Sequence, residues 1–150
     1  MENIFFNPKR LQNTVIKINF IPPIMKKIIN TPNAPAPIGP YNQAVLTGNT
    51  LYISGQIPID PKTNTLIEGD IQKETKQSME NLKAILFEAG MTFENVVKAS
   101  IFVKDMHQFA KINEVYGSYF DANTAPARET VEVANLPKFV NVEISMIAIK

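Results

Sequence analysis

The segment 139–149 alternates between two kinds of side chain, which is the period of a β-strand. The first set is apolar throughout and consists of Val140, Val142, Ile144, Met146 and Ala148. The second set is mixed and consists of Asn141, Glu143, Ser145, Ile147 and Ile149. This pattern predicts a strand in a sheet that packs one face on a hydrophobic core. The other face is half apolar, so it would leave an exposed patch unless something covers it.

Two segments have the period of an amphipathic helix. Asp70 opens the first, which ends before Gly90, and its apolar stripe is Ile71, Thr75, Ser78, Met79, Leu82, Ile85, Leu86 and Ala89. Asp105 starts the second, with Gln108 three residues later as in a capping box. Its stripe is Met106, Phe109, Ile112, Val115, Tyr116 and Tyr119. Aromatic residues at this spacing are more often core than ligand-binding, so we assign this stripe to the core.

The other periodic segments are short and read as strands. Gly48-Asn49 between two of them is a hairpin signal, because primed turns need positive φ angles. Residues 60–69 carry turn chemistry and are predicted to be a loop. The predicted strands cover 26–30, 43–47, 50–54, 96–103, 128–133 and 139–149.

This order of elements predicts an α+β fold, a mixed sheet with both helices packed on one face. No third helix is predicted to cover the second face, which carries Glu143 beside Ile147 and Ile149. A half-apolar face of this kind requires another subunit. We therefore expect an oligomer.

Composition excludes several classes of function. The net charge of +1 offers no basic field for nucleic acid, and no apolar run reaches the roughly 18 residues needed to span a bilayer. The absence of Cys excludes disulfides and thiolate chemistry and fits a reducing, cytoplasmic location. The single His107 cannot build a multi-histidine metal site, and we expect it at the surface, near a helix cap. Neither common glycine-rich phosphate loop is present, so no metal and no cofactor is predicted.

The first 24 residues differ in composition from the rest and end in Ile21-Pro22-Pro23-Ile24. We treat 1–24 as an N-terminal extension, disordered or from a non-native start, and 25–150 as one domain. The extension is basic and acid-poor, as organellar targeting segments are, but it lacks their Ser and Arg enrichment and a helical stripe.

Arg128 is the one arginine between Met25 and Lys150, where there are eleven lysines. Arginine holds a carboxylate or phosphate with two parallel hydrogen bonds, which lysine cannot do. Arg128 is therefore a candidate anion clamp. A surface ion pair is the alternative.

Four blocks of sequence resemble the signatures of the Rid (YjgF) family, in the same order. They are Ala34–Ala44 (APAPIGPYNQA), Tyr52–Pro58 (YISGQIP), Lys98–Met106 (KASIFVKDM), and Ala125–Val133 followed by Leu136-Pro137 and Val142-Glu143-Ile144. The resemblance covers nearly all of 25–150 and implies a chorismate-mutase-like α+β fold. It also implies a homotrimer with sites in the clefts between subunits.

The family resemblance implies hydrolysis of 2-imino acids, such as 2-iminopropanoate and 2-iminobutanoate, to 2-keto acids and ammonia. On the matching positions, Arg128 corresponds to the carboxylate clamp and Glu143 to the acid that orients or activates water. The positions that line the pocket are Tyr41, Ser54, Gly55 and Asn113. The resemblance also implies that Thr130 is a substrate-binding position, where close relatives often carry Cys.

Two other functions stay open at this stage. One is a Rid paralogue that acts on a different imine. The other is a non-catalytic role, as a small-ligand or chaperone-like binding protein or an RNA-directed factor, although the near-neutral charge speaks against RNA.

Overall fold

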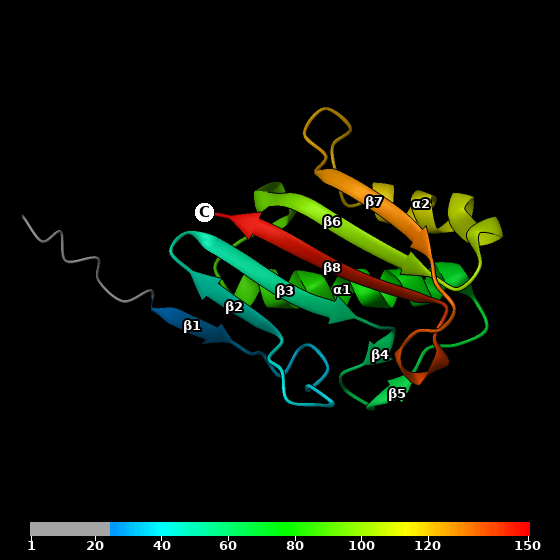
Figure 1. Cartoon of the computed structure of the whole chain (residues 1–150), viewed down its shortest axis with the longest axis horizontal. Helices are drawn as coiled ribbons and strands as arrows, with labels where there is room; N and C mark the ends of the chain where they lie inside the picture. Colours follow the sequence, from blue (N-terminus) through cyan, green and yellow to red (C-terminus); the bar gives the residue numbers. More distant parts are fainter. Residues whose placement is uncertain (1–24) are drawn as a thin grey trace, which may run out of the picture.

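The computed structural model describes residues 25–150, so the predicted extension, 1–24, lies outside the described residues. A six-stranded sheet forms one layer and two helices form the other (Figure 1). The sheet strands are β1 (Lys26–Ile29), β2 (Ala44–Thr47), β3 (Thr50–Gln56), β6 (Val96–Val103), β7 (Ala127–Glu132) and β8 (Val142–Ile149). The helices are α1 (Ile71–Glu88) and α2 (Phe109–Gly117), with single 3₁₀ turns η2 (Phe93–Asn95), η3 (Met106–Gln108) and η4 (Pro137–Phe139).

The strand order across the sheet is β1-β2-β3-β8-β6-β7, which places β8 in the interior and β7 at one edge. Only β6 and β7 run parallel, because the chain passes through α2 between them; every other neighbouring pair is antiparallel. Both helices lie behind the sheet in the view of Figure 1. The predicted α+β architecture, a mixed sheet with both helices on one face, is confirmed.

The core lies between the sheet and the two helices. Val142, Ile144, Met146 and Ala148 of β8 are all buried, as the alternation predicts. Met79, Leu82 and Ile85 of α1 pack in the same cluster, with no solvent exposure. A smaller cluster of Ile57, Ile59, Leu136 and Val140 lies beside the main one.

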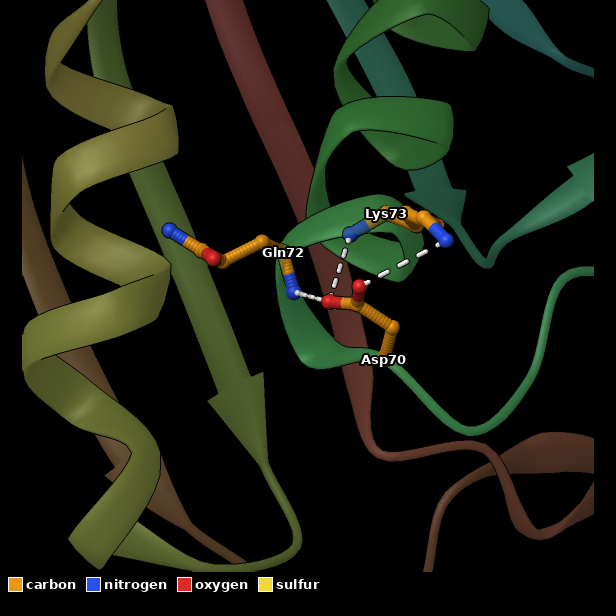
Figure 2. A network of polar contacts seen from close by, with 3 residues as sticks. All are labelled: Asp70, Gln72 and Lys73. Atoms are coloured by element: carbon orange, nitrogen blue, oxygen red, sulfur yellow. Dashed lines mark hydrogen bonds and ion pairs between the residues drawn. The ribbon is translucent and has the colours of Figure 1, made fainter.

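Both ends of α1 are capped by residues that the sequence indicates. The Asp70 carboxylate accepts hydrogen bonds from the backbone N–H groups of Gln72 (3.0 Å) and Lys73 (3.4 Å), and Lys73 Nζ lies 3.7 Å from its other oxygen (Figure 2). At the other end Gly90 has φ of +68°, and its N–H donates to Phe87 O while Met91 N–H donates to Leu86 O. This is a Schellman motif, for which glycine is favoured.

The structure corrects three boundaries. The last strand begins at Val142 and not at residue 139, because Lys138 and Phe139 have φ of +55° and +59° and turn the chain through η4. The predicted loop 60–69 overlaps a small hairpin in which β4 (Ile59–Asp60) pairs with β5 (Thr65–Leu66). The Asp105 side chain caps η3, so α2 itself begins only at Phe109.

The apolar stripe predicted for the second helix is also partly wrong. Ile112 and Tyr116 are buried, but Met106 and Phe109 are exposed. His107 is exposed in η3, next to the Asp105 cap, as predicted. Within residues 25–150, no helix is long and apolar enough to cross a membrane.

The Asp70 cap gives a direct test of the fold. We expect Asp70→Ala to lower the free energy of unfolding by about 1 kcal/mol, because two N–H groups lose their acceptor. Asp70→Asn is the matched control, since Asn caps nearly as well, and should cost much less. Urea unfolding measures both; equal losses in the two variants would contradict the capping role.

Candidate functional site

A buried amide holds the proline-rich loop that precedes β2. Gln43 Oε1 accepts from Thr31 N–H (2.7 Å), and Gln43 Nε2 lies within 3.1 Å of the carbonyl oxygens of Thr31, Ala34 and Pro35. This contact fixes the loop against the sheet. It thereby positions Ile38 and Tyr41, which face a cavity, and Tyr41 Oη accepts a further bond from Ile38 N–H (3.2 Å).

Glu143 lies on the face of the sheet opposite the helices, directly over Gly55. A Cβ added to Gly55 would overlap the Glu143 carboxylate and would lie 2.9 Å from Cγ. The β3–β8 register is irregular between Ile53 and Gln56, which carries Gly55 out of the regular ladder. The chain therefore needs glycine here to make room for the carboxylate.

The Glu143 cavity has a volume of about 280 Å³ and is lined by Ile38, Tyr41, Gly55, Ile57, Pro137 and Glu143. Burial raises the pKa of the Glu143 carboxyl, because the charged form loses water there. A second buried amide, Asn81 of α1, donates to the carbonyl oxygens of Ile57 (3.1 Å) and Ile59 (3.0 Å) and fixes the apolar wall.

Arg128 lies on the edge strand β7 and points to the helix side. Its Nη1 donates to Asn113 Oδ1 at 2.7 Å, and its Cζ lies 4.9 Å from the centre of the Tyr116 ring and 5.7 Å from that of Phe109. We call these four residues the Arg128 cluster. Among residues 25–150, no carboxylate lies within ion-pair distance of the guanidinium.

Arg128 and Glu143 project from opposite faces of the sheet. Arg128 is in register with Ala99 of β6, whose side chain is buried on the helix side. Glu143 is in register with Phe102, three residues further along the same strand. Because side chains alternate along a strand, an odd separation places the two groups on opposite faces.

The other predicted site residues divide between these two places. Tyr41 and Gly55 line the Glu143 cavity, and Asn113 belongs to the Arg128 cluster. Ser54 precedes Gly55, and its hydroxyl donates to Asn42 O at 2.7 Å. Thr130 Oγ1 is buried in β7, two residues after Arg128, and has no hydrogen-bond partner in the described part of the chain.

The sequence interpretation missed four residues of these sites. Phe109 and Tyr116 were assigned to the core, which is right for Tyr116 and wrong for Phe109, but the contact of both rings with Arg128 was not predicted. Their spacing from Asn113, four and three residues, puts all three on one helix face and was an available signal. Gln43 and Asn81 have no comparable signal, because their partners are distant backbone carbonyl groups.

In residues 25–150, no group of three acidic or histidine side chains is placed to hold a metal ion.

Comparison with known proteins places the chain in a family. A family model described as Endoribonuclease L-PSP matches residues 31–150. A RutC family protein of Pyrococcus horikoshii is 55% identical over 126 residues, which cover 84% of this chain and 99% of that protein. The chain belongs to the Rid family.

Two further Rid proteins carry more specific names. The 2-iminobutanoate/2-iminopropanoate deaminase of Salmonella typhimurium is 48% identical over 128 residues, covering 84% of this chain and 99% of its own. The crystal structure of Escherichia coli TdcF with bound serine has a TM-score of 0.78 and 44% identity, covering 83% of this chain and 98% of that one. The fold described above is thus the fold of the Rid family.

The contact between Gly55 and Glu143 can be tested by adding one methyl group. We expect Gly55→Ala to displace the Glu143 carboxylate from the cavity and to lower the free energy of unfolding by about 1–3 kcal/mol, as overpacking does. Gly117→Ala in α2 is the control, because nothing lies within 4 Å of its added Cβ, and it should cost nothing. Crystal structures and urea unfolding of both variants measure this; an unmoved Glu143 in Gly55→Ala would refute the close packing.

Proposed function

We propose that this Rid protein hydrolyses small 2-imino acids, such as 2-iminopropanoate and 2-iminobutanoate, to 2-keto acids and ammonia. The observation that carries the proposal is the Arg128 guanidinium, which is oriented by its neighbours and has no carboxylate partner among the described residues. Such a group binds an external carboxylate. The deaminase name of the Salmonella relative supports the same chemistry.

The active form in this proposal is a homotrimer of the chorismate-mutase-like kind, with sites between protomers. A small substrate cannot touch Arg128 and Glu143 of one chain, because the sheet lies between them. Two chains bring an Arg128 and a Glu143 together when the β7 edge of one protomer meets the open face of its neighbour. Arg128 of the first and Glu143 of the second then face the same ligand.

The open face of the sheet also supports assembly. Ile28, Val45, Tyr52 and Ile147 are in register across β1, β2, β3 and β8 and form an apolar row on the side without helices. Tyr52 is 49% exposed and Ile28 is 39% exposed. An apolar row that crosses four strands is stabilised when another protein surface covers it.

The chemistry needs only an oriented substrate, one water and one carboxyl group. Arg128 binds the substrate carboxylate through both nitrogens of its fork, which fixes the adjacent C=N carbon. The oxygen of water attacks this carbon, the π electrons of the C=N bond pass to nitrogen, and nitrogen gains a proton. In the resulting carbinolamine the hydroxyl proton passes to nitrogen through Glu143, the oxygen lone pair forms the C=O bond, and the C–N bond breaks to release ammonia.

Glu143 moves the protons in this scheme. Its raised pKa keeps the proton on the carboxyl group to a higher pH, so it can protonate the imine nitrogen. The carboxylate that remains takes the proton that the attacking water releases. General acid–base catalysis of this kind contributes about 10²–10⁴-fold.

The walls of the Glu143 cavity favour short apolar substrates. Ile38, Ile57 and Pro137 offer no polar side-chain atom, and the volume of about 280 Å³ suits a methyl or ethyl group beside the reacting carbon. Nothing in this scheme needs an organelle or a membrane, and a cytoplasmic location stays a prediction from composition.

We expect Arg128→Lys to lower kcat/KM for 2-iminobutanoate on the order of 100-fold, although the charge is kept, because the second hydrogen bond to the carboxylate is lost. The assay generates the imine from an amino acid with an oxidase and follows keto-acid release. Lys76→Arg, at an exposed position of α1, controls for a Lys/Arg exchange elsewhere and should have wild-type rates. Normal turnover by Arg128→Lys would refute the clamp; no acceleration by the wild type with any 2-imino acid would refute the deaminase.

Mixed trimers test whether the two groups come from different protomers. Arg128→Lys and Glu143→Gln chains should each be nearly inactive alone. Unfolded together in equal amounts and refolded, they should recover about one quarter of the wild-type activity, since a random trimer joins an intact Arg128 to an intact neighbouring Glu143 at one site in four. Activity equal to the mean of the two separate variants would place both groups of a site in one chain.

A further inference from the structure

The guanidinium of Arg128 touches three side chains, and all of them come from one face of α2. Asn113 Oδ1 accepts a hydrogen bond from Nη1 at 2.7 Å. The rings of Tyr116 and Phe109 lie 4.9 Å and 5.7 Å from Cζ. None of the three carries a charge.

The carboxylates of β7 and the one next to Asn113 are engaged elsewhere. Glu129 follows Arg128 in sequence but projects to the other face of the sheet, where it accepts from Lys98 Nζ and Ser100 Oγ. The bond from Lys98 lowers the pKa of the Glu129 carboxyl. Glu114, next to Asn113, accepts from Gln72 of α1, and Glu132 accepts from Met106 N–H. The positive charge of Arg128 is therefore held in place but not neutralised within the described chain.

We propose that Phe109 and Tyr116 are positioning residues that, together with Asn113, hold the Arg128 fork in one orientation while leaving its full charge for the ligand. This inference rests on the proposed function, because it concerns the same anion site. An acidic partner would hold the fork as firmly, but it would compete with the substrate carboxylate. Aromatic faces and a neutral amide orient the fork without that competition.

The two rings have different parts in this arrangement. Tyr116 is 4% exposed and forms a fixed floor under the guanidinium. Burial raises the pKa of the Tyr116 hydroxyl to about 12, against a smaller opposing effect of Arg128, which moves ionisation of this ring still further from physiological pH. Phe109 is 37% exposed and borders the guanidinium at the protein surface. It limits the directions in which the long side chain can swing.

The affinity for the ligand carboxylate that this ordering adds is mainly entropic in origin. An arginine side chain has several rotatable bonds and loses much rotamer entropy when it is ordered. A fork that is already ordered by α2 has less of this cost left to meet when the ligand arrives. A clamp that binds the carboxylate equally in substrate and transition state should act on KM more than on kcat.

The decisive variant is Asn113→Asp. It keeps an oxygen acceptor at the same place but adds a charge that pairs with Arg128. If Asn113 only supported the structure, this change would preserve or improve the site. We expect instead that the melting temperature stays at or above the wild-type value while the Kd for 2-oxobutanoate, measured by calorimetry, rises at least tenfold.

Two controls accompany this variant. Ala110→Asp adds the same charge at an exposed position of α2 and should leave the Kd within twofold of the wild type. Phe109→Leu removes the ring but keeps an apolar side chain, and should raise Kd and KM about three- to fivefold with kcat within twofold, as loss of an exposed cation–π contact predicts. Phe109→Tyr, which restores a ring, should recover most of that loss.

The outcomes separate this inference from the proposed function. Wild-type binding of 2-oxobutanoate by Asn113→Asp, or equal Kd values for Phe109→Leu and the wild type, would overturn the positioning role of the uncharged side chains around Arg128. Neither result would affect the deaminase proposal, which depends on turnover by the wild type. Failure of the wild type to hydrolyse any imine, with the variants weakened in keto-acid binding as expected, would remove the deaminase and keep the inference.

Discussion

The fold depends on β8, a strand that pairs with a neighbour on each side. One of its faces packs in the core, and the other carries Glu143. The strand pairs with β3 and β6 along nearly its whole length, and its helix-facing side chains are fully buried. A shift of one residue in its register would put Glu143 into the core and Met146 into solvent. The same pairing that builds the core therefore fixes where the acid lies. Fold and chemistry depend on one register.

The sheet also separates the two groups that the proposed function brings together. Arg128 is carried on an edge strand and supported by α2, whereas Glu143 is carried on a central strand and lies over a glycine. A single chain thus keeps this guanidinium and this carboxyl group from pairing with each other. Such a pair would lower the energy of a single chain, but it would use up both groups. Keeping opposite charges apart within one chain preserves them for a ligand.

Regular elements were predictable from local patterns, and contacts across the fold were not. The helical stripe from Ile71 to Ala89 and its Gly90 stop follow from period and capping alone. The start of β8 was placed three residues too early, because apolar Val140 continues the alternation while Phe139 takes a positive φ that alternation cannot reveal. β4 and β5 were missed because two-residue strands have no period.

Phe109 fits a core stripe by spacing, and only the position of β7 shows that its neighbour is Arg128. Gly55 was identified from the family motif, but its physical reason, the carboxylate above it, required the sheet.

The amide of Gln43 has a consequence for how this protein can change over generations. Each of its contacts in the proline-rich loop is made to a backbone group, from Thr31 N–H to the carbonyl oxygens of Thr31, Ala34 and Pro35. Substitutions such as Ile38 to a smaller or larger residue leave these bonds intact, because no side chain of the loop takes part in them. The loop that borders the Glu143 cavity can thus vary its side chains while its path stays the same. The lining of the cavity can therefore change in size without loss of the hydrogen bonds that hold the loop.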